Sequence, residues 1–187
     1  MMENRLITVK ASIDHLLAHQ DRVLVAIDGY CTAGKTTLAG KLAEVYDCNL
    51  FHMDDFFLQP HQRTEERYAE IGGNVDYERF HEEVLLPLKG DKEFNYCPFD
   101  CKNLTLKAPV TVAPKKLTII EGVYSLHPYF GEPYDLKIFL NVTPELQRSR
   151  VLERPAFLQD AFFEKWIPME KRYFSEFRIQ EKCDLVL

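Results

Sequence analysis

RVLVAIDGYCTAGKTT, residues 22–37, is the stretch that decides the fold. Residues 22–28 form a short apolar run rich in β-branched side chains, which predicts a buried strand. The segment from Gly29 to Thr36 then matches the pattern G-x-x-x-x-G-K-[ST] at every fixed position. After it, Leu38, Leu42 and Val45 follow at helical spacing. A strand, a glycine loop and a helix in this order predict a phosphate-binding loop, or P-loop.

The chemistry of such a loop predicts ATP and Mg²⁺ as its ligands. The two glycines let successive backbone N–H groups converge on one anion, and the helix N-terminus adds partial positive charge. Lys35 can reach the β- and γ-phosphates, and the Thr36 hydroxyl can ligate Mg²⁺. The expected nucleotide-binding residues are Gly29, Tyr30, Cys31, Thr32, Ala33, Gly34, Lys35, Thr36 and Thr37. A glycine turn beside a surface lysine is the alternative, but a chance match arises in only about one sequence in a hundred.

Composition limits the class of protein. The chain of 187 residues fits one domain, and its hydrophobic fraction of 46% is that of an ordinary globule. The net charge of −6 without a basic stripe argues against a nucleic-acid polymer as partner. The sequence has neither a membrane-spanning apolar run nor a signal-peptide core at its start, so no membrane association is expected. Five scattered cysteines suggest free thiols in a reducing cytoplasm.

Strands and helices alternate along the chain. Further strands are expected at 48–53, 117–120, 135–142 and 184–187, and helices at 4–19, 76–86, 144–154 and 160–178, the last broken near Pro168. Residues 94–100 and 104–112 suggest a hairpin beside the main sheet. The pattern predicts a three-layer α/β fold of the P-loop NTPase kind, with a five-stranded parallel sheet and a small β-hairpin excursion. The single domain, 1–187, has its core at about 20–58 and 115–187 and a substrate-side excursion at about 59–114.

Acidic residues follow three of the expected strands, at Asp28, at Asp54 with Asp55, and at Glu121. Ligands of parallel α/β sheets bind outside the carboxyl ends of the strands. One carboxylate there is expected to help hold Mg²⁺, and another to accept the proton of an attacking hydroxyl. The alternatives are a turn or helix cap for Asp54 and Asp55, and an ordinary strand end for Glu121. Bracing of the loop is favoured over catalysis for Asp28.

Two further groups of polar residues are candidates. Asp76 lies where the helix at 76–86 begins, so a helix cap and a substrate contact are both open. Arg148, Arg150 and Arg154 lie on or just after the helix at 144–154. Such a run is usually a solvated face, but phosphoryl transfer needs arginines to neutralise charge, and one or two of the three are expected to do so.

Six segments in order resemble the uridine kinase group of P-loop kinases. They are GYCTAGKTT at 29–37, MDDFF at 53–57, GGNVDYERF at 72–80, IIEGVYS at 119–125, RSRVLERP at 148–155 and KCDLVL at 182–187. The DDFF stretch also resembles nicotinamide riboside kinases. The resemblance covers the chain from about residue 22 to its end.

This resemblance implies a role for each matching residue. Asp54 matches the general base toward the ribose 5′-hydroxyl, and Asp55 is its neighbour on the substrate side. Asp76, with Tyr77 beside it, matches the aspartate that grips the ribose hydroxyls. Glu121 matches the glutamate near the metal. The three arginines match those of the lid helix.

The sequence also departs from the family pattern. Tyr30, Cys31 and Thr32 replace the usual small loop residues, and base-recognition residues are not recognisable at 98–106. The expected function is therefore ATP-dependent phosphorylation of a small-molecule alcohol, with the 5′-hydroxyl of a nucleoside such as uridine or cytidine favoured. Nicotinamide riboside, pantothenate, a sugar or glycerate are alternative acceptors, and a catalytically silent nucleotide-binding regulator is a further alternative. A homo-oligomer is compatible with the sequence.

The loop cysteine gives a separate expectation. Cys31 lies in the cradle near Lys35, and neighbouring N–H groups and an ammonium favour the thiolate. An unusually reactive thiol and an inert small residue are equally open readings of this position.

Overall fold

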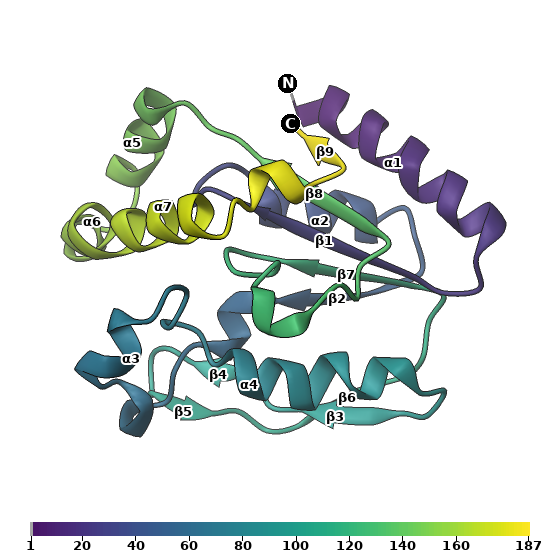
Figure 1. Cartoon of the computed structure of the whole chain (residues 1–187), viewed down its shortest axis with the longest axis horizontal. Coiled ribbons are helices and arrows are strands. Elements are labelled where there is room, and N and C mark those ends of the chain that lie inside the picture. The colour runs from purple at the N-terminus through teal and green to yellow at the C-terminus, as the bar shows by residue number, and fades with distance from the viewer. Residues whose placement is uncertain (1) are drawn as a thin grey trace.

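A five-stranded parallel sheet forms the centre of the protein (Figure 1), whose computed structural model describes residues 2–187. The strands are β1 (Val23–Gly29), β2 (Cys48–His52), β7 (Leu117–Glu121), β8 (Leu136–Leu140) and β9 (Leu185–Val186). They lie in the order β2-β7-β1-β8-β9, and every neighbouring pair is parallel. The predicted α/β fold with five parallel strands is confirmed.

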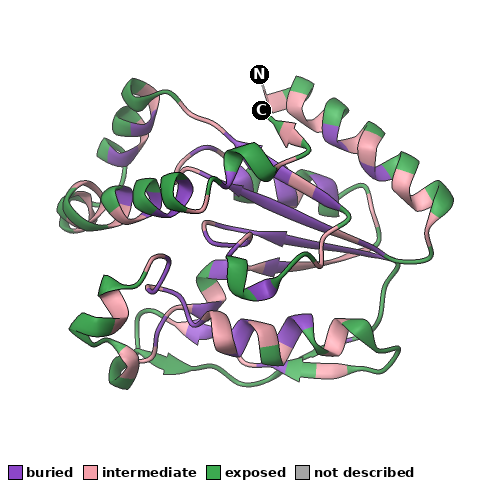
Figure 2. Cartoon of the chain, in the orientation of Figure 1, coloured by how far each residue is buried: buried purple, intermediate pink, exposed green. Residues whose placement is uncertain are grey.

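Two apolar cores lie on opposite faces of the sheet. Side chains alternate along each strand, so Ile119 joins one core and Ile120 the other. Helices α1 (Met2–His19) and α2 (Lys35–Ala43) cover the first face and contribute Ile13 and Leu38. Burial follows the strands through the middle of the molecule (Figure 2). The apolar spacing predicted a helix that includes Val45. Helix α2 ends before this residue, and the Val45 side chain is exposed.

The excursion at 59–114 packs below the second face and carries its own short elements (Figure 1). It holds α3 (Glu65–Ala69), α4 (Tyr77–Phe80) and a π-helical turn at His81–Leu85 that continues α4. The expected hairpin is present as two short antiparallel ladders. Strand β3 (Phe94–Tyr96) pairs with β6 (Val110–Val112), and β4 (Phe99–Asp100) pairs with β5 (Thr105–Leu106).

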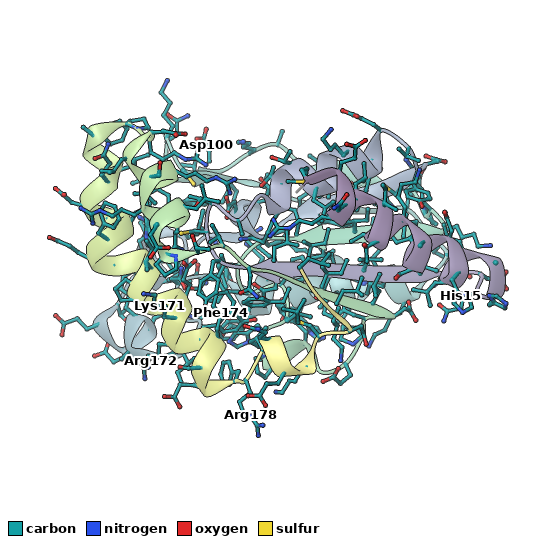
Figure 3. The ribbon with its side chains drawn as sticks, turned by 90° about the horizontal axis from the view of Figure 1, so that it is seen from above. His15, Asp100, Lys171, Arg172, Phe174 and Arg178 are labelled. Atoms are coloured by element: carbon teal, nitrogen blue, oxygen red, sulfur yellow. The ribbon has the colours of Figure 1, made fainter. Side chains whose placement is uncertain are left out.

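Three helices near the C-terminus form a lid over the carboxyl ends of the strands. They are α5 (Pro144–Leu152), α6 (Ala156–Ala161) and α7 (Ile167–Glu176), with a π-helical turn at Phe162–Trp166 between the last two. The predicted break near Pro168 is not seen as an end of the helix, because the backbone stays helical through Trp166 and Ile167, but the wider π-helical turn lies just before this proline, which has no N–H to donate. Figure 3 shows Phe174 on the side of α7 that faces the sheet, where it packs against Phe139.

None of the helices in residues 2–187 combines the length and the apolar character needed to cross a membrane.

Candidate active site

The P-loop runs from the end of β1 to the start of α2. Gly29 has φ +132° and Gly34 has φ +98°, conformations that residues with a side chain rarely adopt. Within residues 2–187 no side chain caps the first turn of α2, so its N–H groups stay available to a ligand. The backbone therefore has the shape of an anion cradle.

Gly29→Ala tests this backbone. A Cβ there would lie 2.2 Å from the Leu140 carbonyl oxygen. Because backbone strain and overlap add, we expect the free energy of unfolding to fall by roughly 2–5 kcal/mol. Gly40→Ala is the matched control, since a Cβ at this position of α2 meets nothing within 4 Å and alanine favours a helix interior by about 1 kcal/mol. Urea unfolding measures both, and equal stability of the two variants would contradict the prediction.

Lys35 lies inside the cradle. Its side chain is 8% exposed, and Nζ donates to the backbone oxygens of Gly29 at 2.6 Å and Tyr30 at 2.9 Å. The Tyr30 ring packs edge-on against Phe139 and Phe174. Ala33 is buried in the core on the α1 and α2 face. The large Tyr30 side chain, which replaces a small residue of the family pattern, is therefore accommodated by packing against the apolar core.

Thr36 and Glu121 meet at the mouth of the cradle. The Thr36 hydroxyl donates to Glu121 Oε1 at 3.1 Å, and the Glu121 side chain is almost fully buried. Thr37, the next residue of the helix, is exposed. Within residues 2–187 no group of three or more His, Cys, Asp and Glu side chains forms a metal site. Two protein oxygens beside a phosphate cradle nevertheless suit Mg²⁺, which is usually held by one or two protein ligands, phosphate oxygens and water.

His52 is a member of the site that the sequence reasoning missed. It is the last residue of β2, opposite Glu121 in the parallel register, and its Nδ1 lies 2.6 Å from Glu121 Oε1. The hydrogen bond to Glu121 raises the pKa of His52, although burial opposes this. The strand-end rule that selected the carboxylates could have found His52, because it also closes a strand.

Asp54 and Asp55 lie in a short 3₁₀ turn, Met53–Phe56, and not in an extended strand end. Asp54 is accessible to solvent, yet surrounding protein and then the Glu121 charge raise its pKa, while Lys35 lowers it. Burial also raises the pKa of Asp55, which His52, Lys107 and Arg79 lower. Asp54 therefore shares the surroundings of Lys35, and Asp55 is influenced by residues of the excursion.

Asp28 braces the loop. Its buried carboxylate accepts hydrogen bonds from the N–H groups of Gly29 at 2.7 Å and Leu126 at 3.2 Å, and from the Tyr173 hydroxyl at 2.8 Å. Burial raises the pKa of Asp28 to about 6. Both oxygens are engaged, as the bracing interpretation requires.

Asp76 and Tyr77 are both engaged in contacts with other side chains. Asp76 caps α4 by accepting from the Arg79 N–H, and its other oxygen accepts from Gln62 Nε2 at 2.9 Å. The Tyr77 ring stacks on His127 with centroids 4.4 Å apart. The cap interpretation of Asp76 is thus observed, and a ligand hydroxyl would have to replace Gln62 to reach it.

The three lid arginines differ in position. Arg150 reaches the P-loop, where NH1 donates to the Thr32 carbonyl oxygen at 2.6 Å. Arg148 is exposed, and its guanidinium lies over the Phe163 ring at 5.1 Å. Arg154 is exposed beyond the end of α5. The structure brings one of the three to the loop.

Two lid residues that the sequence reasoning missed also contact the loop. Glu170 of α7 accepts a hydrogen bond from the Cys31 N–H at 2.9 Å, and Gln147 of α5 donates to Glu170 at 2.8 Å. No local pattern marks either residue, because both lie among ordinary helix positions.

The Cys31 thiol is not activated in this structure. Burial and the neighbouring Glu170 raise the pKa of Cys31 to about 12, and Lys35 opposes this only in part. This direction favours the reading of Cys31 as an inert small residue, because burial and the carboxylate of a distant helix together outweigh the lysine.

This result gives a prediction for chemical labelling. We expect an alkylating reagent at neutral pH to modify the exposed Cys101 at least about tenfold faster than Cys31, because the thiolate is the reacting species. Mass spectrometry of a time course measures both rates in one sample. Faster labelling of Cys31 than of Cys101 would show that the Cys31 thiol is reactive.

No protein-family model and no curated protein matches the sequence. Two solved structures resemble it over nearly the whole chain. A possible uridine kinase from Bacillus stearothermophilus is 20% identical with a TM-score of 0.71, and the match covers 96% of this chain and 99% of that one. A protein named as a fructose transport system kinase, from Silicibacter sp. TM1040, is 20% identical with a TM-score of 0.74, over 97% of this chain and 98% of that one.

This chain has the fold of the P-loop kinases. The likeness confirms the expected architecture, and the resemblance to uridine kinases holds at the level of the fold. It leaves the roles of individual residues as predictions, since at 20% identity a shared fold does not carry a shared substrate.

Proposed function

We propose that this protein transfers the γ-phosphoryl group of ATP to a hydroxyl of a small molecule, with the 5′-hydroxyl of a nucleoside as the favoured acceptor. The observation that carries the proposal is the convergence of an anion cradle, Lys35, Thr36 and two carboxylates at one end of a parallel sheet. The Thr36 hydroxyl lies 3.1 Å from Glu121 Oε1, and both Lys35 and Glu121 affect the pKa of Asp54, so these groups are near one another.

The proposed mechanism depends mainly on positioning, because phosphoryl transfer passes through a loose transition state that asks little covalent chemistry of a protein. The loop N–H groups and Lys35 hold the phosphates. Thr36 and Glu121 would hold Mg²⁺, which when bound neutralises charge on the phosphate oxygens. Asp54 orients the acceptor hydroxyl and takes its proton. Arg150 and the lid helices exclude water, which would otherwise consume ATP by hydrolysis.

An acceptor screen tests this function directly. Purified protein is incubated with γ-labelled ATP, Mg²⁺ and single candidates from a panel of nucleosides, nicotinamide riboside, pantothenate, sugars and glycerate. We expect label to move to one chemical class, and a nucleoside to be in that class. Binding of ATP without transfer to any member of the panel would favour the nucleotide-binding regulator instead.

The pH dependence of kcat gives a further prediction. The surrounding protein and the Glu121 charge raise the pKa of Asp54, although its side chain is accessible to solvent. A base works only when it is ionised, so kcat falls as the pH drops through the folded-state pKa. We therefore expect the acidic limb of the profile at a higher pH than an ordinary aspartate would produce. Initial rates at saturating substrate measure it, with circular dichroism to show that the protein stays folded; a limb at the ordinary aspartate pKa would contradict the assignment.

A further inference from the structure

A carboxylate from the lid binds a backbone N–H group of the phosphate loop. Glu170 is 1% exposed, its Oε2 accepts from the Cys31 N–H at 2.9 Å, and its Oε1 accepts from Gln147 Nε2 at 2.8 Å. Burial raises the pKa of Glu170, and the hydrogen bond from the Cys31 N–H and the charge of Lys35 oppose this rise by favouring the ionised form. Glu170 has no role in the proposed phosphoryl transfer.

The groups around Glu170 are those that a bound phosphate uses. A carboxylate is a compact anion, and here it engages an N–H group of the loop beside the P-loop lysine. A triphosphate carries several negative charges into the same cradle. Like charges a few ångströms apart away from bulk water repel strongly, so the Glu170 contact and a fully bound triphosphate oppose each other.

The contact also fastens the lid. Arg150 and Gln147 of α5 donate to the backbone oxygens of Thr32 at 2.6 Å and Cys31 at 3.4 Å, and Tyr173 of α7 donates to Asp28 at 2.8 Å. These contacts hold the lid against the loop. Glu170 is the only acidic residue among these four lid residues, and it accepts its hydrogen bond from a backbone N–H of the loop. The other three donate hydrogen bonds, and none of them is an anion.

We propose that Glu170 sets the nucleotide affinity of this protein by competing with the triphosphate for the loop N–H groups, so that ATP binds fully only when the α7 carboxylate withdraws. This inference rests on the proposed function, which supplies the ATP. When the binding-competent state is only partly populated, the apparent affinity falls by that fraction. Removing the charge should therefore raise the affinity.

Calorimetric titration with a non-hydrolysable ATP analogue and Mg²⁺ tests the proposal. Glu170→Gln keeps the size and an acceptor oxygen but removes the charge, and we expect it to bind the analogue about 5–20-fold more tightly than the wild type. Glu176→Gln is the matched control: it removes the same charge from an exposed position of α7 and should bind as the wild type does. Circular dichroism shows that each variant is folded.

Hydrogen exchange of the ligand-free proteins supplies a second readout. Amides of α5 to α7 should exchange faster in Glu170→Gln than in the wild type, because one fastening of the lid is gone. Unchanged or weaker binding by Glu170→Gln, with unchanged exchange, would overturn the proposal and leave Glu170 as a brace of the loop. Failure of the wild type to bind any nucleotide would overturn the proposed function itself, and this titration separates the two failures.

Discussion

Lys35→Ala is expected to lower phosphotransfer by about 10³-fold or more. The lysine side chain is the cation within the cradle, and its Nζ now donates to two loop carbonyls, at 2.6 and 2.9 Å. On nucleotide binding we expect this ammonium to turn to the phosphates, where it would stabilise the negative charge of the phosphoryl group that is transferred. Alanine offers neither charge nor hydrogen bond at that point.

Steady-state kinetics with the acceptor found in the screen measures the loss, and calorimetry measures the expected weakening of ATP binding. Lys41→Ala is the matched control, because it removes the same charge from an exposed position of the same helix. The fold should persist in Lys35→Ala, since the ammonium lies in the loop and not in either apolar core. Near-normal turnover by Lys35→Ala would show that the loop is not a catalytic P-loop.

Asp54→Asn is expected to lower kcat by roughly 10²- to 10⁴-fold, the usual contribution of a general base. Asparagine keeps the size of aspartate but cannot take a proton. Glu121 raises and Lys35 lowers the pKa of Asp54, so both charges lie near its carboxylate. ATP affinity should change little, because the nucleotide is held by the loop.

Asp55→Asn is the comparison that makes the assignment testable. Asp55 lies one residue further along the same 3₁₀ turn, and Lys107 and Arg79 of the excursion affect its pKa. We expect a smaller loss of kcat. A larger loss in Asp55→Asn than in Asp54→Asn would show that Asp55 is the base, and full activity in both would remove the general base from this turn altogether.

The sequence by itself determined the architecture. Strand, glycine loop and helix follow one another within residues 22–46, so their pattern is local and can be read without a fold. The same holds for the five strands, whose apolar runs match β1, β2, β7, β8 and β9. The rule that parallel strands present their carboxyl ends at one edge then brings Glu121 to Thr36, 85 residues away in sequence.

Tertiary structure decided the order of the strands and the surroundings of each charge. Asp54 and Asp55 were expected directly after a strand, and the chain forms a 3₁₀ turn there. His52 acquires its partner 69 residues away, and Cys31 meets Glu170 across 139 residues. The pKa of the Cys31 thiol changes direction for that reason, since burial and a neighbouring carboxylate outweigh the lysine close to it in sequence. Local patterns report backbone preference and periodicity, whereas electrostatic environment depends on which distant segments pack together.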